Sequence, residues 1–157
     1  MDDADVWARI ESLYRSRFAE FERVARGVTS NREAALEAVQ EGFADALRAA
    51  GSWEGRGPLE AWVWRCVVNR ARKTRGRPAV EAPDGLEVGS GPGSDWALRA
   101  RIAALPERQR LVVFLRYFAD LGYREIAEAL GIEVGTVAAT LHAAHASLRS
   151  ALTEERV

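Results

Sequence analysis

Residues 106–148 hold the pattern that most limits how this chain can fold. Three apolar stripes at helical spacing follow one another there: Leu111, Phe114, Leu115 and Phe118; then Tyr123, Ile126, Ala127 and Leu130; then Val137, Leu141, Ala144 and Leu148. Each stripe predicts a helix with one buried face, and Gly131 can take the left-handed conformation that ends the second helix. Two short helices across a tight glycine turn predict a helix-turn-helix, whose second helix enters the major groove of DNA.

The first half of the chain is also predicted to be helical. We expect helices over about residues 5–26, 31–49 and 58–75. Gly27 is expected just after the first helix, while Ser30 and Glu33 fit a capping box that starts the second. In the third helix, Trp62 falls within the buried stripe and Trp64 on the more open side.

Residues 76–95 differ from their surroundings because they are rich in glycine, proline and serine. They carry one arginine against four carboxylates and few bulky apolar side chains, so we expect a mobile acidic linker. The predicted fold is therefore all-α, with two small helical domains joined by a flexible linker. Residues 1–75 would form an N-terminal helical bundle, and residues 96–157 a C-terminal helix-turn-helix domain.

Composition sets further bounds. Hydrophobic residues make up 48% of the chain, enough for real cores, and the net charge of −1 gives no overall attraction to nucleic acid. Any DNA binding must then come from local basic clusters. The lone Cys66 excludes an intramolecular disulfide and fits a reducing compartment. Since the N-terminus lacks a long apolar run, we expect no signal peptide and no membrane insertion, and a cytoplasmic protein.

Two charged surfaces are expected in the first half. Residues Glu37, Gln40, Glu41 and Asp45 form an acidic stripe on the outer face of the second helix, a pattern that by default is only a solvated surface. At the end of the third helix the cations are dense: Arg70, Arg72, Lys73, Arg75 and Arg77. They exceed what the helix dipole needs, and a phosphate-contacting strip is the better interpretation.

Two stretches resemble one protein family. Residues 125–144, EIAEALGIEVGTVAATLHAA, resemble region 4 of bacterial sigma factors, and residues 35–47 with 51–73, ALEAVQEGFADAL and GSWEGRGPLEAWVWRCVVNRARK, resemble region 2. A short chain with both regions and little between them resembles the extracytoplasmic-function (ECF) group. The resemblance implies a transcription initiation factor whose partners are core RNA polymerase, promoter DNA and an anti-sigma factor.

The resemblance also implies site residues in the first half. The acidic stripe, Glu37, Gln40, Glu41 and Asp45, would face the polymerase. The downstream promoter element would be opened by Trp53, Glu54, Arg56, Trp64, Arg65, Asn69, Arg70, Arg72 and Lys73. The loop around Trp53 would hold an unstacked base, and stacking plus edge hydrogen bonds must then offset an unstacking cost of about a few kcal/mol.

The recognition helix departs from the family pattern. No Lys or Arg lies between Val134 and Leu148, so few side chains there can contact phosphates. Reading of the upstream promoter element would depend on backbone amides at the helix start and on these residues: Arg124, Gly135, Thr136, Ala139, Thr140, His142, Ala143 and Arg149.

We expect no enzymatic activity, no cofactor and no metal ion. No nucleophile, base and orienting group cluster in the sequence, and no phosphate-binding glycine loop is present. His142 and His145 are three residues apart but lack further ligands nearby. Two other functions remain open: a stand-alone helix-turn-helix regulator that never engages polymerase, and an interaction protein that occupies polymerase or an anti-sigma factor without productive DNA contact.

The bare recognition helix predicts weak DNA binding by the second half alone. Each bidentate base contact that is absent removes about 1–3 kcal/mol of discrimination. Titration of residues 96–157 with the upstream element at physiological salt should therefore show weak binding. Tight, sequence-specific binding would contradict this prediction.

Overall fold

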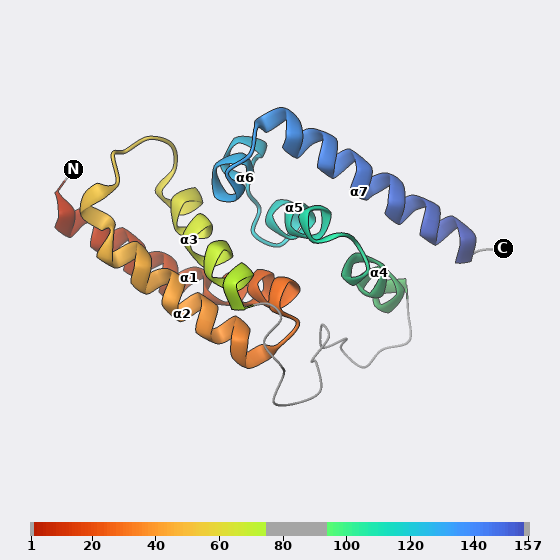
Figure 1. Cartoon of the computed structure of the whole chain (residues 1–157), viewed down its shortest axis with the longest axis horizontal. Coiled ribbons are helices and arrows are strands. Elements are labelled where there is room, and N and C mark those ends of the chain that lie inside the picture. The colour runs from red at the N-terminus through yellow and green to blue at the C-terminus, as the bar shows by residue number, and fades with distance from the viewer. Residues whose placement is uncertain (1, 75–93, 156–157) are drawn as a thin grey trace.

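The computed structural model describes residues 2–74 and 94–155, and every regular element within them is a helix. In chain order these are α1 (Asp3–Thr29), α2 (Arg32–Arg48), the 3-10 turn η1 (Ala50–Ser52), α3 (Leu59–Thr74), α4 (Ser94–Ala103), α5 (Glu107–Tyr117), α6 (Tyr123–Leu130) and α7 (Val134–Glu155) (Figure 1). The all-α fold is confirmed. Most of the expected linker falls outside the described residues, although α4 already includes its last two positions.

The first three helices bury an aromatic cluster. The rings of Phe21 and Trp64 stack with centroids 3.7 Å apart, and Phe43 meets Phe21 edge-on at 4.8 Å. Trp64 is completely buried, whereas Trp62 is only partly buried, so the prediction that placed Trp62 inside and Trp64 on the open side was wrong. The cause is that α3 is covered on several sides, by α1, α2 and α6.

The boundary between α1 and α2 also differs from expectation. Helix α1 continues through Gly27 to Thr29, and Ser30 ends it in the left-handed conformation with φ of 56°. The side chain of Asn31 then caps α2, accepting hydrogen bonds from the N–H groups of Glu33 at 2.9 Å and Ala34 at 3.3 Å. The capping box expected at Ser30 was therefore wrong, because Ser30 forms the turn and Asn31 is the first extended residue.

The second half contains the expected helix-turn-helix. Gly131 ends α6 with φ of 67°, and α6 and α7 meet at a bend of 102°, within the range for this motif. Val137, Leu141 and Ala144 are buried, as predicted, whereas Leu148 is only partly buried. Tyr123, which was placed in the buried stripe of α6, is 42% exposed. Among the described residues, no single helix has the length and apolar character to cross a bilayer; the bent pair α6 and α7 meets those criteria only when taken together.

The two halves share one continuous core. Helix α5 packs against α1, and α6 packs against α3. The ring of Phe114 occupies the space where a side chain on Gly27 would lie, which explains why α1 keeps a glycine in its interior. Residues 111–115 of α5 are consequently buried on all sides, and not along one stripe as predicted.

Polar groups also join the halves. Arg17 lies at a point where α1 departs from helical geometry, with φ of −126°. Its guanidinium donates to the carboxylate of Glu60 in α3 and to the carbonyl of Ala119 after α5. Arg72 of α3 pairs with Glu107 of α5 at 3.3 Å. These contacts tie both ends of α5 to the first half.

Gly27→Ala tests whether the halves are packed together in solution. If they are, the new methyl group overlaps the Phe114 ring and should destabilise the chain by about 1–3 kcal/mol. If they are apart, the change should stabilise α1 by about 0.5–1 kcal/mol, because alanine favours a helix over glycine. The free energy of denaturant unfolding distinguishes the two signs.

Two companion variants sharpen this measurement. Gly135→Ala is the matched control, since a methyl group there meets no atom within 4 Å. In a Phe114→Ala background, the cost of Gly27→Ala should disappear, because the clashing ring is gone. If Gly27→Ala still destabilises the chain without the ring, the contact between Gly27 and Phe114 is not the cause.

Candidate functional site

The acidic stripe lies on α2 and is largely accessible. Gln40 and Glu41 are exposed, while Glu37 and Asp45 are partly buried. Arg70 reaches the stripe from α3: its Nη1 lies 2.9 Å from Oε2 of Glu41, and its Nη2 donates to Oδ1 of Asp45 at 2.8 Å. The stripe expected to face polymerase is thus joined to a residue expected to contact DNA.

Asp45 is strongly stabilised as a carboxylate. Hydrogen bonds from Arg70, aided by Arg48, lower the pKa of Asp45 to about 2, although its partial burial acts in the opposite direction. Because this pKa lies below the unfolded value of 3.8, the pair stabilises the fold above about pH 4 and loses that contribution as the pH falls toward 2. The pair therefore stays charged at every physiological pH.

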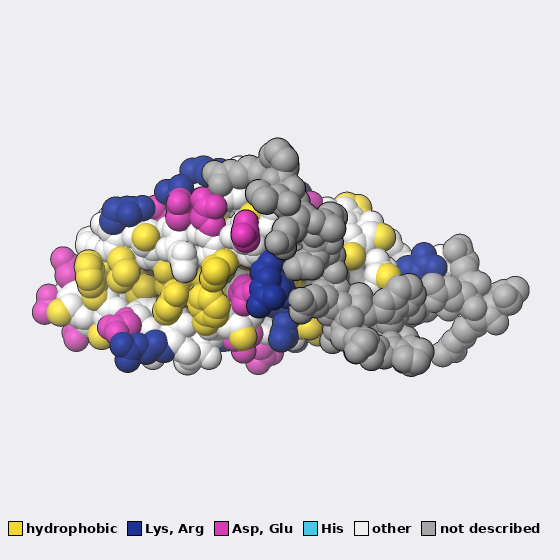
Figure 2. Space-filling model, turned by 90° about the horizontal axis from the view of Figure 1, so that it is seen from below, with side chains coloured by type: hydrophobic (Ala, Val, Ile, Leu, Met, Phe, Trp, Pro, Cys, Tyr) yellow, Lys and Arg dark blue, Asp and Glu magenta, His cyan; other side chains and the backbone are white. Residues whose placement is uncertain are grey.

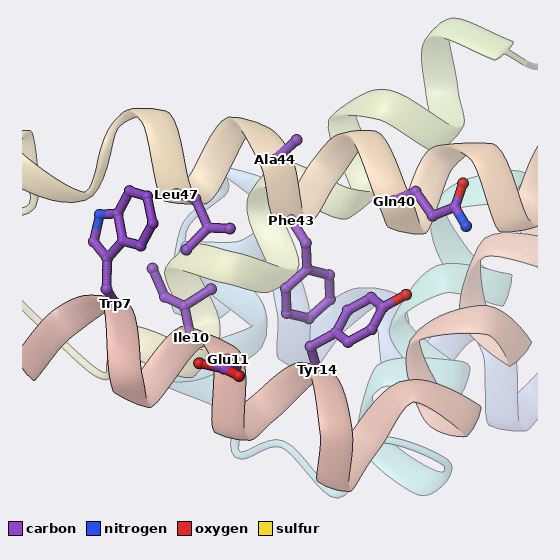
Figure 3. A pocket seen from close by; sticks show the side chains of 8 residues that line it. All are labelled: Trp7, Ile10, Glu11, Tyr14, Gln40, Phe43, Ala44 and Leu47. Carbon is purple, nitrogen blue, oxygen red and sulfur yellow. The ribbon is translucent and has the colours of Figure 1, made fainter. Parts of the chain in front are cut away.

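An apolar groove of about 360 Å³ adjoins the stripe, between α1 and α2. It is lined by Trp7, Ile10, Glu11, Tyr14, Gln40, Phe43, Ala44 and Leu47. In Figure 3, Trp7, Ile10 and Tyr14 of α1 point toward α2, and Phe43 and Leu47 of α2 point toward α1. Figure 2 shows hydrophobic side chains gathered on this face of the molecule, flanked by charged ones. Trp7 is 52% exposed, unusual for so large an apolar side chain.

Sequence reasoning missed this groove. The available signal was the spacing of Trp7, Ile10 and Tyr14, which follows i, i+3, i+7 and places a tryptophan at the edge of the buried stripe of α1. Gln40 belongs both to the groove and to the acidic stripe, so the two form one continuous surface.

The loop expected to hold a base lies between η1 and α3. Trp53 is partly buried, and the guanidinium of Arg9 lies 5.6 Å from the centre of its ring. The indole Nε1 of Trp53 is buried without a hydrogen-bond partner. At the loop tip, Glu54 and Arg56 are exposed and pair with each other at 3.3 Å. Nothing in the sequence pointed to Arg9.

The basic strip of α3 divides into two sets. Arg65, Asn69 and Lys73 are exposed and, being four residues apart, share one face of the helix. Arg70 and Arg72 instead form ion pairs within the protein. Trp64 was expected to contact DNA but is completely buried against Phe21, so that assignment is corrected. Arg75 and Arg77 lie outside the described residues.

The surface expected to read the upstream element is formed by α6 and the start of α7. Exposed positions there are Arg124, Gly135, Ala139, His142 and Arg149; partly buried ones are Thr136, Thr140 and Ala143. Helix α6 also touches the first half: the carboxylate of Glu128 lies where a side chain on Gly57 would be, and Arg65 lies close to Gly131. The two expected DNA surfaces are therefore neighbours.

Two further reactive side chains, His145 and Cys66, are engaged or inert. His145 Nε2 lies 2.8 Å from the hydroxyl of Tyr117. Burial raises the pKa of the Cys66 thiol to about 11, so it stays protonated at neutral pH. Across residues 2–74 and 94–155, no three His, Cys, Asp or Glu side chains gather as metal ligands would.

Comparisons with known proteins place this chain in a family. Residues 13–77 match Sigma-70 region 2, and residues 95–148 match Sigma-70, region 4. An RNA polymerase sigma-E factor from Streptomyces antibioticus is 33% identical over 153 residues, covering 90% of this chain and 83% of the relative. The ECF RNA polymerase sigma factor SigW of Bacillus subtilis (strain 168) is 26% identical, covering 97% of this chain and 91% of the relative.

A solved structure supports the fold. The sigma factor RpoE, in complex with the anti-sigma factor NepR from Bartonella quintana, superposes with a TM-score of 0.68 at 20% identity, covering 91% of this chain and 95% of that one. Both regions thus match in the expected order, and a relative at one-third identity spans nine-tenths of the chain. The chain belongs to the sigma-70 family of RNA polymerase sigma factors, in its ECF group, and is a transcription initiation factor.

Proposed function

We propose that this sigma factor binds core RNA polymerase through the face formed by α1 and α2. One observation carries this proposal: the apolar groove runs directly into the acidic stripe through Gln40. Protein interfaces combine an apolar centre with a polar rim, and large aromatic side chains such as Trp7 supply much of their binding energy. Polymerase is the occupant we assign to the groove, because the groove is continuous with the stripe that resembles the family's polymerase-binding motif.

We assign the downstream promoter element to α3 and the loop before it. Arg65, Asn69 and Lys73 form an exposed row that can follow the phosphates of the duplex. Trp53 supplies an aromatic face for an unstacked base, and Arg9 adds a cation beside that ring.

We infer that the two halves separate when the factor engages its promoter. In the closed arrangement α6 lies against the loop at Gly57 and beside Arg65, so the loop is not fully open to DNA. The upstream element would then be read by the start of α7, with Arg124 and Arg149 at its flanks. Since polymerase, promoter and factor must meet, we place this activity in the cytoplasm. We propose that the factor acts by binding its partners and catalyses no reaction itself.

An anti-sigma factor is a further partner that we propose. The RpoE structure that shares this fold is a complex with an anti-sigma factor. A protein that stabilises the closed arrangement would keep α6 over the loop and so prevent promoter opening. Co-purification of the full chain from its own cells would show core polymerase and such an inhibitor in one experiment.

Gln40→Lys tests the polymerase-binding face. The substitution places a cation at the rim of the groove, within a surface proposed to present carboxylates to its partner. We expect affinity for core polymerase to fall about tenfold or more, with a matching loss of promoter-dependent run-off transcription. Ser12→Lys is the matched control, because it adds the same charge at an exposed position of α1 that does not line the groove. Wild-type affinity in Gln40→Lys would favour a stand-alone DNA-binding regulator.

Trp53→Ala tests the base-holding loop. Loss of one stacked base costs about 1–3 kcal/mol, so open complexes should fall by roughly one order of magnitude while affinity for core polymerase is unchanged. Trp53→Phe keeps an aromatic face and should retain most of the activity. Thermal unfolding of both variants separates a loss of stacking from a loss of structure. Normal promoter opening by a folded Trp53→Ala would exclude this role.

A further inference from the structure

Four charged side chains of α2 and α3 form one cluster: Glu41, Asp45, Arg48 and Arg70. Arg70 binds Asp45 with two nitrogens, Nε to Oδ2 and Nη2 to Oδ1, and its third, Nη1, lies 2.9 Å from Oε2 of Glu41. Sequence reasoning placed Arg70 with the DNA strip and Asp45 with the polymerase contacts. The geometry joins them to each other instead.

Asp45 is occupied from both sides. Oδ2 accepts from Arg70, and Oδ1 accepts from both Arg70 and Arg48. A carboxylate held by two arginines remains ionised at any working pH, consistent with its pKa of about 2. Its role is therefore that of an internal anchor for Arg70.

Glu41 differs from Asp45 because its side chain is 48% exposed. Its pair with Arg70 uses Oε2, and a carboxylate can accept several hydrogen bonds through its two oxygens. Glu41 can thus bind an external partner while Arg70 limits its rotamers. Holding a flexible side chain in its bound conformation reduces the entropy lost on association.

We propose that Arg70, anchored by Asp45, is a positioning residue of the polymerase-binding surface that holds Glu41 ready for its partner. This inference rests on the proposed function and adds to it a division of labour: Glu41 makes the contact, while Arg70 and Asp45 act through it. Arg70 is thereby removed from the DNA strip, whose exposed row, Arg65, Asn69 and Lys73, lies on a different face of α3.

The position of Arg70 argues against a phosphate contact. Two carboxylates already neutralise its guanidinium, and all three of its nitrogens engage α2. Moving it to DNA would leave Asp45 and Glu41 without this cation. Lys73, which is exposed on the row, carries no such restraint and provides a contrasting variant.

The test is a double-mutant cycle on equilibrium binding of the full chain to core polymerase. Arg70→Ala should weaken binding about two- to tenfold, which is the cost of ordering one freed side chain on association. In a Glu41→Ala background the same change should have no further effect. Arg70→Lys should give an intermediate loss, because an ammonium cannot form the two-pronged contact. Asp45→Asn should match Arg70→Ala, since it removes the anchor.

A second measurement distinguishes a role of Arg70 in polymerase binding from a role in DNA binding. With core polymerase saturating, open-complex formation by Arg70→Ala should equal that of the wild type, whereas Lys73→Ala should reduce it and lower its salt dependence. Arg116→Ala, which breaks an arginine–aspartate pair in the second half, controls for the loss of one cation. Thermal unfolding identifies variants that fail to fold. If Arg70→Ala is one of them, the milder Arg70→Lys and Asp45→Asn are compared with the wild type in its place.

Three results would overturn the inference. Unchanged core affinity with weaker open complexes would return Arg70 to the DNA strip. Tighter core binding by Arg70→Ala would mean that Arg70 competes with polymerase for the carboxylates. An equal loss with and without Glu41 would make Arg70 a direct contact. If the wild-type chain itself does not bind core polymerase, the proposed function fails, a result distinct from all three.

Discussion

The packing of the two halves against each other depends on one contact, that of the Phe114 ring with Gly27. It lets α5 approach α1 closely enough for residues 111–115 to be buried on every side. With α5 fixed, α6 comes to rest on α3, and Arg17 closes the junction through Glu60 and Ala119. The free factor is therefore one body with one core, although its sequence divides into two family regions.

In this arrangement the two faces of the first half differ in how accessible they are to a partner. The face of α1 and α2, with its groove and carboxylates, is open to a large partner in the closed form. The loop around Trp53 and the adjacent part of α3 lie close to α6 instead. A factor built this way can meet polymerase before it meets promoter DNA, and separation of the halves would link the two events.

The sequence predicted what depends on local pattern and missed what depends on contacts between distant residues. Most of the buried stripes of α6 and α7 and the left-handed Gly131 were correct, because periodicity and turn chemistry are local; Tyr123, at the start of α6, is the exposed exception in its stripe. The exposures of Trp62 and Trp64 were inverted, since helical spacing cannot show that Trp64 faces Phe21 of α1. The same limit applies to the site: charge density found the strip at residues 70–77, but only the fold shows that Arg70 turns toward α2.

The two halves are packed together in the free chain and are proposed to separate on the promoter, and a distance measurement between them tests both statements. Spin labels at the exposed positions Ser16 and Ser150, with Cys66 replaced by alanine, would report the separation of the halves. We predict one narrow distribution for the free chain and a shift to longer distances with core polymerase and promoter DNA. A broad distribution in the free chain, or no change in the complex, would contradict it.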